Sequence, residues 1–159
     1  MISHIYDLLG QFIMDNLGVP VIELNQNAPL ANKPFITVGI NSTRITSTPC
    51  RYDVDDNGIQ KTILNKEIVV SFEAFSDNLH QSDEILQQLE HSLLCDQSFT
   101  VLTDKLVYIN SINGVQSVSG ILNDYTESRA LLECTFRYQQ QINVNTGIIE
   151  EAEVENTNL

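Results

Sequence analysis

The sequence predicts an α+β fold, a two-layer sandwich in which two amphipathic helices cover one face of a mostly antiparallel sheet. Three observations lead to this prediction. Two segments place apolar residues at helical spacing, several others alternate apolar and polar residues as half-buried strands do, and Asn57-Gly58 is a strong hairpin signal. Elements with one apolar face each must bury those faces against one another, and helices packed on an antiparallel sheet achieve this.

The first helix is expected over residues 3–17, with Ser3 as its N-cap. Its apolar residues recur every three or four positions, and polar residues occupy the opposite side. A short β-branched strand follows at 19–24, and Pro20 restricts it to a strand start or a sheet edge. A loop over 25–34 then leads into the first long strand.

The centre of the fold is a long hairpin over residues 35–75. Its second arm alternates over 65–75, and the two arms are joined by the turn 53–58. If pairing extends over 59–75, this arm reaches about 55 Å at ~3.3 Å per residue, so part of the hairpin must project beyond the sheet. A projecting two-stranded ribbon is marginal in water, which suggests that a neighbouring subunit covers it.

The second helix is expected over residues 78–94, where leucine and isoleucine share one stripe. Two strands follow, at 106–112 and 130–138, and a run of small polar residues at 114–120 interrupts the chain between them. The expected order is therefore helix, strand, hairpin, helix and two strands.

We expect one domain over residues 1–142 and an acidic C-terminal tail over 143–159. The tail has little periodicity and contains four glutamates, so it should be mobile in the free subunit. At 159 residues, the chain is long enough to bury a real core without disulfides or metals.

The composition is that of a globular protein in which acidic residues outnumber basic ones. Hydrophobic residues make up 42% of the chain, charged residues 18%, and the net charge is −13. Such a charge gives no long-range attraction to phosphate, so tight binding of nucleic acid is not expected. No apolar run approaches the ~20 residues of a membrane span, and the N-terminus lacks the features of a secretory signal. We therefore expect synthesis in the cytoplasm and no association with membranes.

The turn Asp53-x-Asp55-x-Asn57-Gly58 matches the first half of an EF-hand calcium loop. The twelfth position of that motif, which should be a bidentate glutamate, is Leu64, and the flanks alternate as strands do instead of forming helices. A solvated hairpin tip explains the same residues, since Asp, Asn and Gly are favoured in reversals. A calcium-binding module remains an alternative.

The cysteines and histidines give no signature of catalysis. Cys50, Cys95 and Cys134 are odd in number and widely spaced, and Cys134 has the pattern of a small buried hydrophobe. His91 and Cys95 lie four residues apart on a helix, but a metal needs three or four ligands. We predict no enzymatic activity, no metal and no cofactor; a small thiol-dependent or metal-dependent enzyme is the weaker alternative.

Four of the eight basic residues fall in the hairpin region, where they are mixed with acids. Such charges could set the register against another protein, or they could simply keep an exposed ribbon soluble. The expected contact residues lie around the turn and at the one apolar spot of the tail; they are Arg51, Asp53, Asp55, Asp56, Asn57, Lys61, Ile148 and Ile149.

Several segments resemble those of tailed-bacteriophage neck and tail-terminator proteins. They are the strand start Pro34-Phe35-Ile36-Thr37-Val38, the strand 69–76, the strand 127–138 and, similar to the closing motif of that family, Gly147-Ile148-Ile149-Glu150. The resemblance extends from residue 2 to residue 155. It implies a non-catalytic virion structural protein, commonly a sixfold ring at the head-proximal end of the tail tube that stops tube polymerisation.

The resemblance also implies the partners. They are other copies of the chain in a ring, commonly a hexamer, together with the tail tube protein and the head-connector or neck proteins. DNA would pass through without tight binding, and the protein would reside in the tail or neck of the virion. Another neck, connector or minor tail protein is the alternative within the same class.

Overall fold

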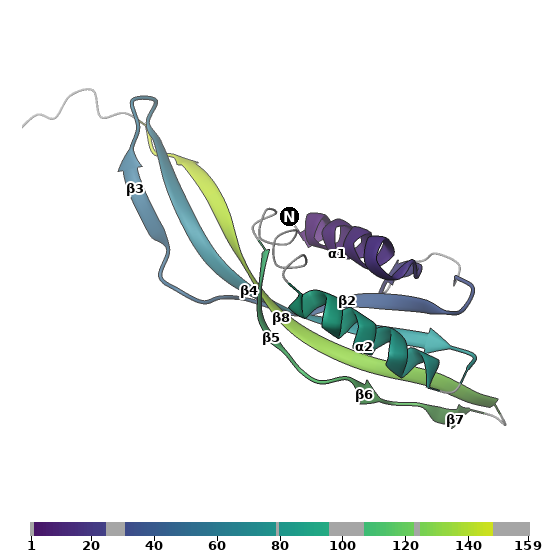
Figure 1. Cartoon of the computed structure of the whole chain (residues 1–159). Helices are drawn as coiled ribbons and strands as arrows, with labels where there is room; N and C mark the ends of the chain where they lie inside the picture. Colours follow the sequence, from purple (N-terminus) through teal and green to yellow (C-terminus); the bar gives the residue numbers. More distant parts are fainter. Residues whose placement is uncertain (1, 25–30, 79, 96–106, 123–124, 148–159) are drawn as a thin grey trace, which may run out of the picture.

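The computed structural model describes residues 2–24, 31–78, 80–95, 107–122 and 125–147. In this part of the chain, two helices, α1 (Ile2–Leu17) and α2 (Gln81–Leu94), lie on one face of a twisted sheet (Figure 1). None of the described helices is long and apolar enough to cross a membrane.

The sheet is mostly antiparallel, with the main strand order β1-β2-β4-β8-β5. Among the described pairings, only β1 with β2 is parallel. This architecture confirms the predicted α+β sandwich. The strands are β1 (Val21–Glu23), β2 (Phe35–Ile45), β3 (Cys50–Val54), β4 (Ile59–Ser76), β5 (Val107–Ile112), β6 (Gln116–Ser117), β7 (Gly120–Leu122) and β8 (Tyr125–Asn145).

The centre of the sheet is the pair β4 and β8. They run antiparallel without a register shift, from Ile59 opposite Asn145 to Ser76 opposite Ser128. β2 and β3 pair in succession with the other edge of β4, so together they form the first arm of the predicted hairpin. The chain passes between them at residues 46–49, which belong to neither strand.

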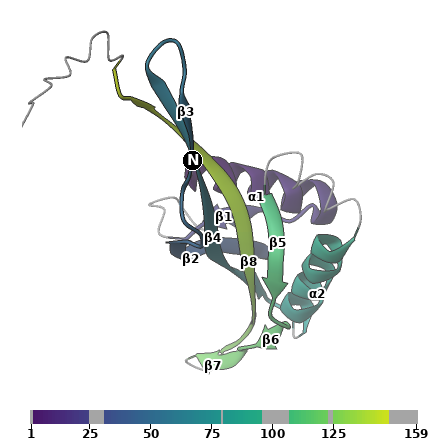
Figure 2. The ribbon, with the colours of Figure 1, turned by 90° about the vertical axis from the view of Figure 1, so that its left-hand side faces the viewer.

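The far half of this strand pair projects beyond the helices as a ribbon (Figures 1 and 2). We define the ribbon as β3, residues 59–65 of β4 and residues 139–145 of β8. The predicted projecting hairpin is thus present, but it has a third strand because β8 continues well past Tyr138. The run Gln139-Gln140-Gln141 has no apolar alternation, so its pairing with β4 could not be deduced from the sequence pattern.

The core lies between the helices and the apolar face of β4 and β8. Phe72 and Phe136 meet there edge to face, with ring centroids 6.5 Å apart. The fully buried apolar side chains of this core include Ile5, Leu9, Ile13, Ile68, Val70, Ala74, Leu86, Leu89, Ala130 and Leu132. These are the alternating strand positions and the helical stripes that the sequence predicted.

Some element boundaries differ from the predictions. α1 begins at Ile2, so Ser3 lies inside the helix and is not the N-cap. α2 begins at Gln81, and His80 precedes it with a left-handed backbone, φ 70°. The small polar run at 114–120, expected as an interruption, contains β6 and the first residue of β7, both of which pair with β8.

Residues 143–145 of the expected tail belong to β8 and pair with β4. Residues 148–159 lie outside the described residues. The division into a domain of residues 1–142 and a mobile tail of residues 143–159 stays a prediction.

Cys134 is 1% exposed within the core, and its burial raises the pKa of the thiol to about 12, with smaller contributions from Glu90 and Glu133. At about pH 8, roughly one Cys134 side chain in ten thousand would be a thiolate. We expect iodoacetamide to modify Cys50, which is exposed on β3, at least about 100-fold faster than Cys134 in the isolated subunit.

Peptide mass spectrometry of timed samples would measure both rates, and unfolding in guanidinium should make them similar. Comparable rates in the folded protein would contradict the burial of Cys134.

Candidate assembly interface

The tip of the ribbon is a tight turn organised by Asp55. Its Oδ1 accepts hydrogen bonds from the backbone N–H groups of Asn57 and Ile59, each at 2.9 Å. The backbone N–H of Asp55 donates to the carbonyl of Ile59 at 3.0 Å, and Gly58 takes the positive φ of 73° that closes the turn. Asp55 is therefore a structural residue of the turn, and the neighbouring Asp53 and Asp56 are exposed.

The turn lies between two strands, β3 and β4, and not between the helices of an EF-hand. In the described part of the chain, no group of three or more His, Cys, Asp or Glu side chains is arranged to hold a metal ion. The thiol of Cys95 contacts His91 through the backbone: it donates a hydrogen bond to the backbone carbonyl of His91 at 3.1 Å.

The ribbon carries exposed apolar side chains, and neither of the two described helices covers its strands (Figure 1). Val54 and Val144 both lie opposite Gln60 in the pairing, which places them on the same face of the ribbon. On the adjoining part of the ribbon, Lys61 Nζ lies 5.5 Å from the centre of the Tyr52 ring. The exposed large apolar residues in and beside the ribbon are Ile45, Tyr52, Val54, Ile142 and Val144. Clustered apolar side chains outside a core are typical of protein contact surfaces.

A buried carboxylate lies near the base of the ribbon, on the sheet face opposite the helices. Glu67 is 2% exposed, and the pairing places it between Arg44 on β2 and Arg137 on β8. Arg44 donates from Nε and Nη2 to Oε2 at 2.8 and 2.6 Å, and Arg137 donates from Nε to Oε1 at 2.8 Å. Asn110 adds a bond to Oε1 at 3.2 Å. The two guanidinium groups hold the pKa of Glu67 below its ordinary value.

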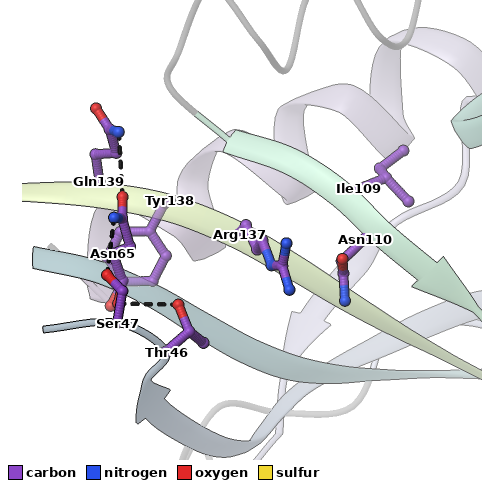
Figure 3. A pocket seen from close by; sticks show the side chains of 8 residues that line it. All are labelled: Thr46, Ser47, Asn65, Ile109, Asn110, Arg137, Tyr138 and Gln139. Carbon is purple, nitrogen blue, oxygen red and sulfur yellow. Dashed lines mark hydrogen bonds between the residues drawn. The ribbon is translucent and has the colours of Figure 1, made fainter.

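Beside this cluster, a cavity of about 570 Å³ opens where the ribbon leaves the body (Figure 3). A chain of hydrogen bonds forms one wall: Gln139 donates to Asn65 at 3.1 Å, and Asn65 donates to Ser47 at 3.0 Å. The eight lining residues are Thr46, Ser47, Asn65, Ile109, Asn110, Arg137, Tyr138 and Gln139. Arg137 is the one charged residue among them, and its side chain is 55% exposed.

The cavity region has an excess of positive charge. Arg44 and Arg137 share the single carboxylate of Glu67, so the three side chains together carry one positive charge. At the other end of the same sheet face the excess is negative, because two basic side chains there pair with three carboxylates; Arg129 pairs with Glu73 at 2.5 Å. Lys33 lies there too, between Glu127 at 3.0 Å and Asp77 at 3.3 Å.

Comparison with known protein families decides the identity. The sequence matches the family model described as phage neck terminator protein over residues 3–159. The chain belongs to this family. No individual curated protein matches it significantly. The resemblance predicted from the sequence is thereby confirmed, and the chain is a structural protein of the phage neck.

In this neck terminator, the predicted contact residues around the turn gather at the far end of the ribbon. They are Arg51, Asp53, Asp55, Asp56, Asn57 and Lys61, whereas Ile148 and Ile149 lie outside the described residues. Their role as contact residues stays a prediction. Sequence reasoning missed the cavity and the cluster around Glu67, because both depend on the register that places Arg44 and Arg137 on either side of one glutamate.

The Glu67 cluster gives the neck terminator a pH-dependent contribution to stability. Because the folded-state pKa of Glu67 is lowered, this contribution is present above the ordinary value of 4.5 and is lost as the pH falls through the folded-state pKa. We expect Glu67→Gln to lower the free energy of unfolding near pH 6 and to reduce the further loss on acidification, compared with the wild type.

Guanidinium unfolding of dilute protein at a series of pH values from about 6 to about 3 would measure this difference. Glu73→Gln, on the same strand but outside the cluster, removes a carboxylate that pairs with one arginine, and so controls for the loss of a single ion pair. A Glu67→Gln variant whose stability depends on pH as steeply as that of the wild type would show that the cluster does not act in this way.

Proposed function

We propose that this protein assembles head-to-tail into a closed ring, commonly a hexamer in this class, at the junction of the phage tail and head, with the ribbon of each subunit lying on the next. The ring would end the tail tube and present a docking surface to the head connector or neighbouring neck proteins. It would act by shape and assembly, without catalysis. The main observation that supports this proposal is that the ribbon projects from the body with apolar side chains exposed (Figure 1).

The ribbon is costly for an isolated subunit. Among the described residues, no second layer covers either face of its strands (Figures 1 and 2), and Tyr52, Val54 and Val144 are between 44% and 48% exposed. Apolar side chains exposed on such an extended element cost free energy in water, so the ribbon gains stability when another molecule covers them. A contact between the ribbon and a different part of the next subunit is heterologous, and such contacts close into a ring when the rotation fits.

The charge of the protein is compatible with DNA passing through such a ring. With a net charge of −13, the subunits would repel the phosphate backbone over most of their surface and would not hold it tightly. We expect the protein to be made in the host cytoplasm and then built into the tail or neck of the virion.

The ring can be tested by changing exposed ribbon residues, which should leave the fold of the subunit intact. We expect the wild type to form discrete rings and the pair Val54→Ser and Val144→Ser to raise the concentration needed for assembly by roughly tenfold or more, since each buried valine contributes about 1.5 kcal/mol. Light scattering over a concentration range, with electron microscopy of the large species, would measure the effect.

Val118→Ser is the matched control, because Val118 and Val144 are both 44% exposed and Val118 lies outside the ribbon. Circular dichroism would verify that each variant is folded. If the wild type stays monomeric at every concentration and in the presence of tail tubes, the proposal is wrong.

A further inference from the structure

We infer that the acidic turn at the tip of one subunit's ribbon docks in the arginine-containing cavity at the base of the next subunit's ribbon. This inference rests on the proposed ring and identifies the two surfaces that meet in it. The occupant of the cavity is thus a second copy of this chain.

The cavity is suited to carboxylates. Its region carries the unbalanced positive charge of Arg44 and Arg137, and the cavity wall adds the side-chain amides of Asn65, Asn110 and Gln139. Arg137 has five N–H donors, of which Nε–H bonds to Glu67 among the described residues. Because its side chain is 55% exposed, the other donors can be reached from outside. Guanidinium groups bind carboxylates in paired, charge-assisted hydrogen bonds.

The tip presents carboxylates in a fixed arrangement. Asp55 is used within the turn, where it accepts two backbone hydrogen bonds that fix the loop, and the neighbouring Asp53 and Asp56 take no part in these bonds. Both neighbours are exposed. A rigid turn loses less conformational entropy on docking than a flexible loop would.

The two surfaces of one subunit cannot meet each other. They are joined by residues 59–65 of β4, an extended segment of about 20 Å at ~3.3 Å per residue. The tip must therefore find the cavity of a different molecule. Since tip and cavity are different parts of the surface, the contact is heterologous, as a ring requires.

Charge complementarity favours this occupant over nucleic acid. The cavity is a local positive region on a protein of net charge −13, so a DNA duplex approaching it would meet repulsion from the rest of the surface. The turn of a second copy, with its two exposed aspartates, would contact only the local positive region at the cavity. The volume of about 570 Å³ is within the range of cavities that enclose small ligands, which leaves room for these side chains.

A charge-reversal experiment on the full chain tests the inference. Gln139→Glu adds a negative charge to the cavity wall without changing any group that bonds Glu67. We expect it to raise the midpoint concentration of ring assembly roughly tenfold or more, because the tip would now meet a like charge. Combining it with Asp53→Lys and Asp56→Lys should bring the midpoint back toward the wild-type value, whereas the two lysine changes alone should raise it.

Gln87→Glu, on the exposed side of α2, is the matched control for an added charge and should leave the midpoint unchanged. If the wild type forms rings but Gln139→Glu acts no differently from Gln87→Glu, or the lysine changes give no rescue, the docking is wrong while the ring stands. If no rings form in solution or on tail tubes, both proposals are wrong. If Gln139→Glu abolishes binding of a fluorescent DNA duplex and leaves assembly unchanged, the cavity serves nucleic acid and the docking inference is overturned.

Discussion

The antiparallel pairing of β4 with β8 is the constraint on which the rest of the fold depends. β4 has 18 residues and would span about 60 Å if fully extended, whereas the 14 residues of α2 span about 21 Å. The helices can therefore cover only part of the strand pair. The covered part becomes the core, and the uncovered part becomes the ribbon. The division between body and ribbon follows from this mismatch in length.

The Glu67 cluster lies where the sheet passes from the covered body toward the ribbon. A carboxylate that is 2% exposed would be costly to bury alone, but Arg44 and Arg137 approach it from the strands on both sides. Three neighbouring strands are thereby fixed in register near the ribbon base. The same arrangement uses two arginines for one acid, and it leaves the cavity beside it with positive charge on an otherwise acidic protein.

Local patterns were sufficient to predict most of the body. The alternation around Phe72, the helical stripe containing Leu89 and the turn at Asn57-Gly58 each depend on residues close in sequence, and the structure confirms them. The third strand of the ribbon could not be predicted in this way. Its glutamines show no alternation, and its conformation is fixed by hydrogen bonds to β4, some eighty residues earlier in the chain. The cavity depends on the same distant pairing, so it could not be predicted from local sequence patterns either.

The absence of a register shift between β4 and β8 has a mechanical consequence. Both strands pass from the body into the ribbon as single paired elements, so the described residues contain no hinge between the two parts. Hydrogen bonds in an antiparallel pair lie perpendicular to the strands. A pull on one strand along its axis would therefore load many of these bonds in shear at the same time, instead of opening them one after another. The continuous pairing therefore lets the strands resist a force applied along their axis between the tip of the ribbon and the body.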